Sequence, residues 1–199
     1  PQLLIGDHFN ILIFLFSPEF GFAGPPRELT FWLPHDEASP KTIDHTEWQA
    51  LLGNYLITNS TDGINRYHYG RVTPEDKNHL AHYLSSLEML DPRVYARTEQ
   101  KAYWINLYNA VTVKLIIDNY PVKSIKKLGQ GFFAFGPWDD PLVKIADQTL
   151  SLNDIEHKIL RPIFRDSRIH FAVNCASLGC PNLSASAYTP QNIEQQLEQ

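Results

Sequence analysis

The chain has two cysteines, Cys175 and Cys180, in the stretch RIHFAVNCASLGCP (168–181). A thiol with its ordinary pKa of about 8.5 is mostly protonated at neutral pH, so a nucleophilic cysteine needs a base or a positive field beside it. The mostly apolar residues on both faces predict a central strand over 169–176. The end of a rigid strand presents a side chain at the edge of a domain. This pattern indicates a candidate nucleophile at Cys175.

Two histidines are candidates for the base. On a strand, His170 lies about 16 Å from Cys175 and on the opposite face, which argues against direct pairing. His157 belongs to a separate helix predicted over Leu152–Leu160, so it can approach Cys175 across space. Asp154, three residues before His157, shares its helical face and could orient the imidazole ring. We therefore take His157 as the candidate base.

Two asparagines occupy the most apolar segment, TEQKAYWINLYNAVTVKLIIDNYP (98–121), which predicts a central buried helix. Asn106 and Asn109 lie three residues apart there. Either amide could orient His157 or donate to an oxyanion. The alternative is structural, because a buried amide needs partners and can bond the backbone of a loop such as 129–141.

The cysteines have other possible uses. Cys175 could be an ordinary buried apolar residue. A Cys175–Cys180 disulfide needs Cα atoms within about 7 Å and suits an exported protein. A metal site built from His170 and the two cysteines has only three ligands and a weak Cys-x4-Cys spacing. We expect no metal site, and the lack of a glycine-rich nucleotide loop leads us to expect no cofactor.

The aromatic loop GQGFFAFGPWDDP (129–141) offers a binding surface through Phe133, Phe135 and Trp138. Such a loop suits a non-catalytic protein-interaction module. It is the alternative to an enzyme that acts on a small-molecule or peptide substrate.

Composition narrows the class of protein. The chain has 199 residues, 43% of them apolar, and a formal net charge of -5. This length supports one domain with its own core. The chain lacks the basic patch of nucleic-acid-binding proteins, so no nucleic-acid partner is expected.

The N-terminal segment predicts a leader. The apolar run Ile11–Phe16 is too short for a transmembrane helix, which needs about 20 residues, so no span is expected. Residues 1–23 resemble a degenerate signal segment, although they carry Asp7 and no lysine or arginine. We expect a leader or linker over 1–43, a domain over 44–199 and an exported or periplasmic location.

The other elements follow from local signals. Helix starts are predicted by the capping-box pattern of Asp44 and Glu47 and by Thr73-Pro74-Glu75-Asp76. LVKIADQTLSL (142–152) predicts a hairpin. Thr189-Pro190 begins a last helix that still runs at Gln199, so we expect a domain truncated at its C-terminus. The predicted fold class is α+β: N-terminal helices and a central buried helix packed on a small antiparallel sheet.

Three stretches together, AYWINLYNAVTVKLIIDNYPVKSIKKLG, LSLNDIEHKILRP and IHFAVNCASLGCPNLSASAYTPQNIEQQL, resemble domain-of-unknown-function family 547 over about residues 44–199. The resemblance implies a bacterial, often exported protein, or a C-terminal domain of a larger plant protein. It brings no established reaction. It places the Glu156-His157 pair, the two asparagines and the Asn174-Cys175 pair in the family's recognisable core.

These observations lead to one functional hypothesis and one alternative. The hypothesis is a thiol-dependent hydrolase or acyl transferase in which Cys175 pairs with His157, on a fold similar to that of cysteine peptidases. The alternative is the non-catalytic interaction module.

Overall fold

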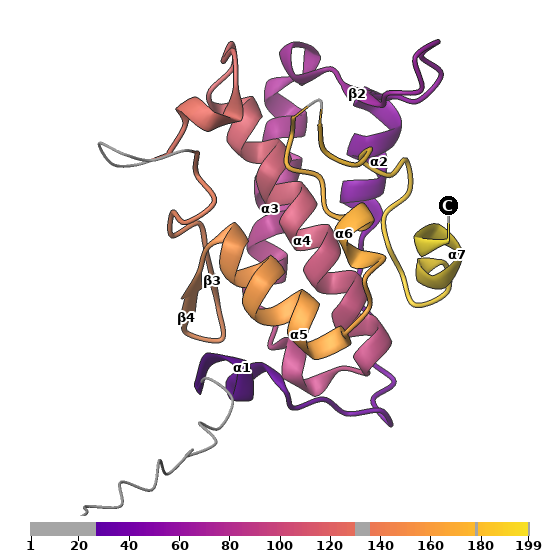
Figure 1. Cartoon of the computed structure of the whole chain (residues 1–199), viewed down its shortest axis with the longest axis vertical. Helices are drawn as coiled ribbons and strands as arrows, with labels where there is room; N and C mark the ends of the chain where they lie inside the picture. Colours follow the sequence, from indigo (N-terminus) through magenta and orange to yellow (C-terminus); the bar gives the residue numbers. More distant parts are fainter. Residues whose placement is uncertain (1–26, 130–135, 178, 199) are drawn as a thin grey trace, which may run out of the picture.

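The computed structural model describes residues 27–129, 136–177 and 179–198 (Figure 1). These residues form mostly helices together with two separate two-stranded antiparallel sheets, so the predicted α+β class is confirmed. The likeness to cysteine peptidases stays a prediction. The expected signal segment, residues 1–23, lies outside the described residues.

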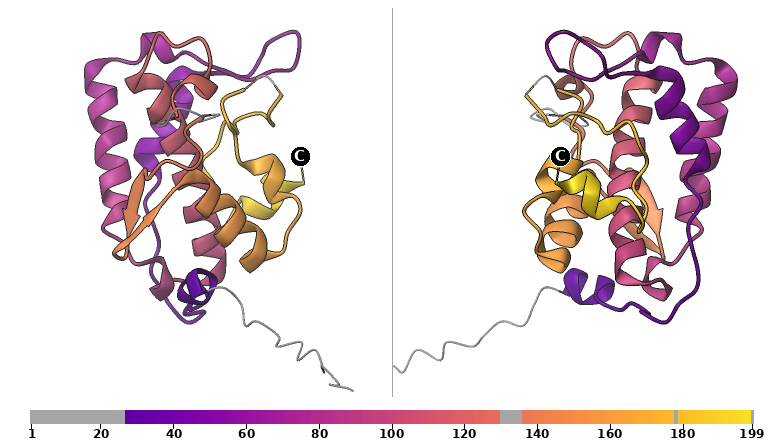
Figure 2. Two further views of the ribbon diagram at one scale, coloured as in Figure 1. Left: turned by 60° about the vertical axis from the view of Figure 1, so that its left-hand side comes forward. Right: turned by 90° about the vertical axis from the view of Figure 1, so that its right-hand side faces the viewer.

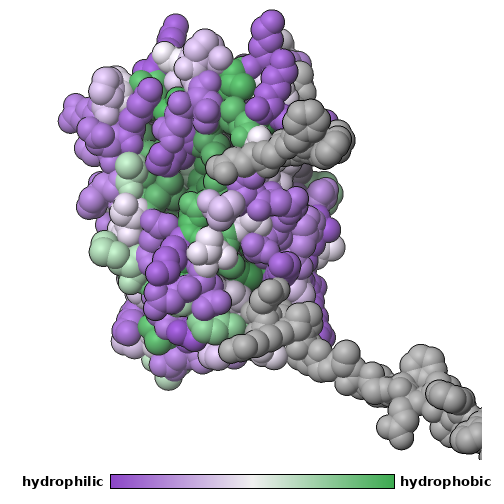
Figure 3. All heavy atoms as spheres, turned by 90° about the vertical axis from the view of Figure 1, so that its left-hand side faces the viewer, coloured by the Kyte–Doolittle hydropathy of each residue, from purple (hydrophilic) through white to green (hydrophobic). Residues whose placement is uncertain are grey.

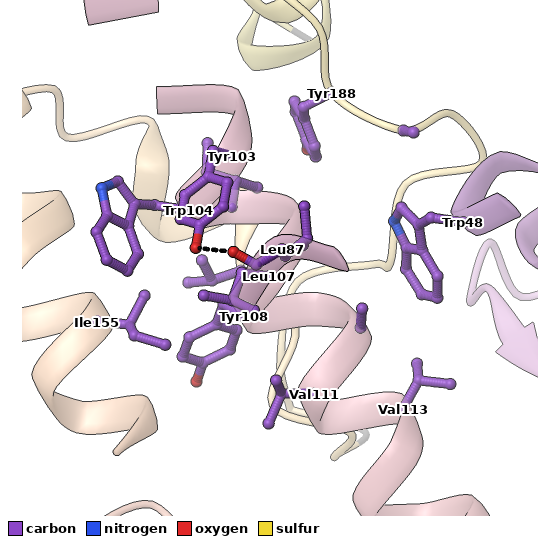
Figure 4. Packing of buried hydrophobic residues seen from close by; sticks show 14 of the residues in the cluster. Trp48, Leu87, Tyr103, Trp104, Leu107, Tyr108, Val111, Val113, Ile155 and Tyr188 are labelled. Carbon is purple, nitrogen blue, oxygen red and sulfur yellow. Dashed lines mark hydrogen bonds between the residues drawn. The ribbon is translucent and has the colours of Figure 1, made fainter. Parts of the chain in front are cut away.

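Helix α4 (Arg97–Asp118) runs through the centre of the molecule, as predicted. Every residue from Glu99 to Val113 is buried, because the helix is covered on all sides. Figure 4 shows Trp48 and Ile155, from elements far apart in the sequence, packed on opposite sides of α4. In Figure 2 the N-terminal helices lie on one side of α4 and the segment after residue 160 lies on the other.

The N-terminal helices are α2 (Thr46–Tyr55) and α3 (Pro74–Glu88). The predicted cap of α3 is confirmed, since the Thr73 side chain accepts the backbone N–H of Asp76 at 3.1 Å. Helix α2 is also confirmed, but its predicted capping box forms only in part, since the Asp44 carboxylate accepts the backbone N–H of Thr46 at 2.8 Å while Glu47 does not bond back to the helix start. Its Glu47 carboxylate binds Nδ1 of His82 on α3 at 2.9 Å, so a contact between helices replaces the local one.

The predicted hairpin is confirmed as β3 (Val143–Ile145) and β4 (Gln148–Leu150). Its two turn residues have positive φ, 44° at Ala146 and 63° at Asp147. This is the backbone twist that tight hairpins favour. A second pair, β1 (Leu56–Ile57) with β2 (Arg66–Tyr67), was not predicted.

The predicted helix Leu152–Leu160 forms but continues past Pro162, so its predicted end is wrong. It comprises the π-helix η4 (Asp154–Leu160) and helix α5 (Arg161–Phe164). The backbone N–H of Arg161 bonds to the carbonyl of Glu156, five residues back. The wider π turn relieves the clash that a proline ring makes in an α-helix.

The predicted strand over 169–176 is wrong. Residues Ile169–Ala172 form the short helix α6, and the described chain after it pairs with no strand. The cause is the turn before it, where the Asp166 carboxylate accepts the backbone N–H of Arg168 at 3.1 Å. The buried side chains of this segment follow helical spacing: residues 169, 172 and 173 are buried, whereas Phe171 is 68% exposed.

The remaining elements are short. Helix α1 (Arg27–Trp32) packs the Trp32 ring against that of Trp104, with 5.0 Å between centroids. Helix α7 (Ile193–Leu197) lies near the end of the chain and begins later than the predicted cap at Thr189. The 3-10 turns are η1 (Tyr69–Arg71), η2 (Pro92–Val94) and η3 (Ile125–Lys127).

Figure 3 shows a largely hydrophilic face with a narrow hydrophobic stretch along its middle. Among the described helices, none combines the length and the apolar character that a membrane crossing requires.

Candidate functional site

The structure pairs Cys175 with Cys180 in a disulfide, with 5.9 Å between their Cα atoms. Both residues are half-buried. The backbone N–H of Cys180 also donates to the carbonyl of Ser177 at 2.9 Å, which tightens the turn. Residues 175–180 therefore form a small closed loop, which we call the cysteine loop.

Asn174 closes the base of the cysteine loop independently of the sulfurs. Its Nδ2 donates to the carbonyl of Pro181 at 2.6 Å. Its Oδ1 accepts the backbone N–H of Ala176 at 2.9 Å. One side chain thus bonds the residue after Cys175 and the residue after Cys180, and it joins the two ends of the loop independently of the sulfurs.

Asn109, 2% exposed on α4, holds the chain just before the cysteine loop. Its Nδ2 donates to the carbonyl of Ala172 and its Oδ1 accepts the backbone N–H of Asn174, each at 2.9 Å. The amide therefore satisfies one carbonyl at the end of α6 and one N–H two residues later.

Asn106, one helical turn earlier and fully buried, repeats this arrangement. Its Nδ2 donates to the carbonyl of Tyr188 at 2.7 Å, and its Oδ1 accepts the N–H of the same residue at 2.9 Å. Figure 4 shows Tyr188 on its irregular segment beside α4. Within the described residues both asparagines thus bond backbone groups, Asn109 at residues 172 and 174 and Asn106 at residue 188.

His157 and Asp154 lie on η4, away from these bonds. Asp154 caps the helix, with Oδ2 accepting from the Ser151 backbone N–H and hydroxyl at 2.9 Å each, and its Oδ1 pairs with Lys158 at 2.8 Å. His157 is exposed and makes no hydrogen bond within the described residues. No hydrogen bond in the described part of the chain joins its side chain to Cys175, so their pairing stays a prediction.

His170 belongs to a chain of polar groups that the sequence did not reveal. Arg161 binds the Glu156 carboxylate at 2.6 Å and lies 3.1 Å from Nδ1 of His170. Because α6 replaces the predicted strand, the separation of about 16 Å between His170 and Cys175 that a strand implies no longer applies. Even so, no hydrogen bond joins the two within the described residues.

The aromatic loop is only partly described. Phe133 and Phe135 lie outside the described residues. Trp138 is half-buried and packs against the core. Its ring covers Gly136, where a Cβ atom would lie 1.9 Å from Cζ3, so only glycine fits there.

A hollow of about 320 Å³ lies between the β1–β2 hairpin and the cysteine loop. Cys180 lines it from one wall, and Tyr67 and Tyr69 line it from the other. We call it the cysteine hollow. It gives a small molecule a place beside the disulfide.

Tyr67 is the unusual residue of the cysteine hollow. Its side chain is 7% exposed, and its hydroxyl is buried without a hydrogen-bond partner in the described residues. Burial, with smaller effects from Tyr55, Tyr69 and Asp76, raises the pKa of Tyr67, which stays a neutral donor. Sequence reasoning missed this residue, and its only signal there is a cluster of tyrosines around β2.

A larger hollow, of about 740 Å³, lies on the other side of residues 181–183. The two hollows share Asn65 and residues 181–183 as lining. Asn65 fixes this strip, because its backbone N–H donates to Oδ1 of Asn182 at 2.9 Å and its Nδ2 donates to the Leu183 carbonyl at 2.8 Å. The exposed Phe171 also lines the larger hollow.

Metal ligation finds no support here. Within residues 27–129, 136–177 and 179–198, no three histidine, cysteine or acidic side chains are grouped so that they could hold a metal ion.

The comparisons assign the chain to a family. A family model described as "Protein of unknown function, DUF547" matches residues 77–199, more than half of the chain, so the protein belongs to this family. The match includes α4 and the cysteine loop, and it begins later than residue 44, where the resemblance begins. Searches among curated proteins and among solved structures found no match.

Proposed function

We propose that this domain carries out thiol–disulfide exchange at the Cys175–Cys180 pair. The observation that carries the proposal is the position of the pair, which lies in a loop fixed to α4 through Asn109 and beside the cysteine hollow. Reactive groups need such support from groups that are themselves held in place.

The reaction begins with an incoming thiolate, which attacks Sγ of Cys180 because Cys180 lines the hollow. A mixed disulfide forms as the Cys175–Cys180 bond breaks, and Cys175 leaves as a thiolate that takes a proton from water. A second thiol then displaces Cys180 from the mixed disulfide. Two thiols become one disulfide, while the protein's disulfide gains two electrons and two protons.

A hydrolase or acyl transferase would use Cys175 in a different reaction, as a nucleophile on a carbonyl carbon. It requires Cys175 as a free thiolate with a base beside it. The proposed exchange needs no base from the chain, because the attacking thiol brings its own thiolate. We therefore favour exchange over acyl transfer by Cys175 and His157.

The interaction module is a second candidate, and one observation favours it. The larger hollow lies beside Phe171, whose side chain is 68% exposed. Exposed apolar side chains at a hollow are typical of binding surfaces. This function is compatible with exchange, since a bound partner could supply the thiol.

The expected exported or periplasmic location supports exchange, because disulfides persist in oxidising compartments. We include that location in the proposal. A cell-fractionation experiment on the full-length protein tests it directly.

The test of exchange follows the mass of the intact protein in redox buffers of increasing reducing strength. We expect a reversible gain of two hydrogens, together with a mixed disulfide at Cys180 in Cys175→Ser. The matched variant Cys180→Ser should form its mixed disulfide more slowly, because Cys175 does not line the hollow. A pair that never oxidises, or a bond that no thiol opens in the folded protein, contradicts the proposal.

A second measurement separates exchange from acyl transfer. Reduced protein is treated with iodoacetamide near pH 6.5. A Cys175–His157 pair predicts that Cys175 labels faster than in a denatured control, because a paired thiolate persists at that pH. The exchange mechanism predicts no such advantage for Cys175.

A further inference from the structure

A third hollow, of about 440 Å³, lies where helix α5 ends and a short turn leads into α6 (Figure 1). It is lined by Arg161, Arg165, Asp166, Ser167 and His170, and we call it the arginine hollow. Except for Asp166, these residues are exposed. The arginine hollow shares no lining residue with the cysteine hollow. A ligand here would meet charged and hydrogen-bonding side chains.

Arg161 is held in place although it is exposed. Its Nε and Nη2 donate to one oxygen of the Glu156 carboxylate, at 3.1 Å and 2.6 Å. On an α-helix, residues five apart point about 140° away from each other. The wider π turn of η4 brings such residues closer to the same side, which allows this pair to form. Nη1 of Arg161 has no partner within the described residues, so it can bind a ligand.

His170 faces the same guanidinium and is fixed as a donor. Nη2 of Arg161 lies 3.1 Å from Nδ1 of His170. An arginine can only donate, so Nδ1 accepts and the ring proton lies on Nε2. The Ser167 hydroxyl, which has no partner within the described residues, is a second donor beside it.

Asp166 is the acid among the lining residues, and its carboxylate is already neutralised. Its two oxygens accept from Nε and Nη2 of Arg168 at 2.9 Å and 2.8 Å, and one of them also accepts from Lys101 at 2.8 Å. The unoccupied groups of the arginine hollow are therefore mainly donors.

Arg165 adds a positive charge without a counterion. Within the described residues its guanidinium makes no hydrogen bond or ion pair. Its backbone lies in the left-handed region, with φ 50° and ψ 35°, at the end of α5. Glycine is the usual residue at such a helix end, because a Cβ atom is unfavourable there. An arginine at a position that favours glycine points to a use for its side chain.

We propose that the arginine hollow binds the phosphate group of a small polar molecule. A phosphate monoester carries about 1.5 to 2 negative charges at neutral pH and three acceptor oxygens, which suit two guanidinium groups, a hydroxyl and an imidazole N–H. A carboxylate offers one charge and two oxygens. The volume lies within the range of small-molecule sites, so it has room for more than the phosphate. The inference is independent of thiol exchange.

Titration calorimetry of the full chain tests the proposal, with inorganic phosphate and glycerol 3-phosphate as probes at constant ionic strength and pH 7.5. Each should bind at one saturable site per chain. Glycerol 3-phosphate should bind at least as tightly as phosphate, because the hollow also accommodates the glycerol group. Acetate is the carboxylate probe and should bind about tenfold more weakly than phosphate, since it offers fewer charge-assisted hydrogen bonds.

Arg165→Gln should weaken phosphate binding about tenfold or more, the effect of losing hydrogen bonds between charged groups. Arg71→Gln is the matched control, because Arg71 is exposed and does not line the hollow, and the substitution changes the net charge equally. Its affinity should equal that of the wild type. Arg165→Gly should also lose binding, while its thermal midpoint stays at or above that of the wild type, because glycine suits the positive φ.

Three results would overturn the inference. The first is the absence of saturable phosphate binding to the wild type. The second is equal affinity for phosphate and acetate, which would leave no preference for a phosphate group. The third is an equal response of Arg165→Gln and Arg71→Gln, whether both keep or both lose binding, because the arginine hollow would then not be the site.

Discussion

Oδ1 of Asn109 accepts the backbone N–H of Asn174 at 2.9 Å, so a buried residue of α4 directly fixes the residue before Cys175. The two residues are 65 positions apart in the sequence. This bond connects the core of the domain to the loop that carries both cysteines. The conformation of that loop therefore depends on the position of Asn109 in the core.

Replacing Asn109 by alanine should destabilise the protein by about 2–4 kcal/mol, because it leaves one buried carbonyl and one half-buried N–H without their partner. Chemical denaturation measures this loss. Hydrogen exchange should also quicken at residues 172–176. Asn106→Ala is the matched control, and its faster exchange should centre on Tyr188 instead. Equal exchange patterns in the two variants would refute separate roles for the two amides.

His45 should make the protein acid-sensitive. It is 5% exposed, and burial lowers the pKa of its imidazole to about 4, although nearby Asp44 opposes the shift. Above pH 6.5 the ring is neutral in the folded and unfolded states. As the pH falls from 6.5 to 4, the unfolded state binds the proton first. Stability should therefore fall by about 3 kcal/mol over this range.

Denaturation midpoints between pH 7 and pH 4 test this contribution. His45→Gln is the suitable comparison, since glutamine does not titrate and can still bond the Tyr83 hydroxyl, which lies 2.7 Å from Nδ1. The variant should lose much less stability on acidification. If both proteins respond alike, His45 does not control the acid response.

The ion pair between Lys101 and Asp166 should stabilise the fold. Nζ of Lys101 lies 2.8 Å from Asp166, and both side chains are mostly buried. Hydrogen bonds from Arg168 and Lys101 hold the pKa of Asp166 below its ordinary value, so this stabilisation is present at pH 7 and is lost progressively as the pH falls below about 4. Asp166→Asn should cost about 3 kcal/mol at pH 7, as expected for a broken buried pair.

Glu198→Gln provides the comparison, because Glu198 is exposed and lies 3.7 Å from Arg168. Exposed pairs of this kind contribute less than about 1 kcal/mol. Urea denaturation of both variants measures the difference. Similar losses would mean that Glu194, which also binds Lys101 at 3.1 Å, can replace Asp166.

The hairpin turn offers a stabilising change. Ala146 and Asp147 both have positive φ, which is unfavourable for residues with a side chain. Replacing them by Asn-Gly, the preferred pair for such turns, should raise stability by about 1 kcal/mol. A rise in thermal midpoint measures it. Asp147→Ala, which keeps a Cβ at positive φ, should bring no gain.

The sequence predicted the elements whose signals are local. Helix α4 follows from an apolar pattern on all its faces, and the cap of α3 follows from Thr73 and Pro74. The strand over 169–176 failed because short apolar runs do not distinguish strand from helix. The turn before α6 is held by the Asp166 carboxylate, which also binds Lys101, 65 positions away in the sequence.

The candidate site was predictable only in part. The sequence identified Asn106 and Asn109 as unusual, but their backbone partners lie far along the chain and cannot be read from spacing. Tyr67 was missed for a different reason. An unpartnered hydroxyl is a property of its surroundings, and no residue type or pattern encodes it. The hollow beside Cys180 likewise exists only once the β1–β2 hairpin and the cysteine loop come together.

The asparagine bonds also bear on the order of folding. Asn106 and Tyr188 are separated by 82 residues, and Asn109 and Ala172 by 63. Closing such long loops is slow, whereas α3 and α4 meet through contacts close in sequence. The stretch that carries the cysteines should thus dock last during synthesis on the ribosome, after the helices it lies against have assembled.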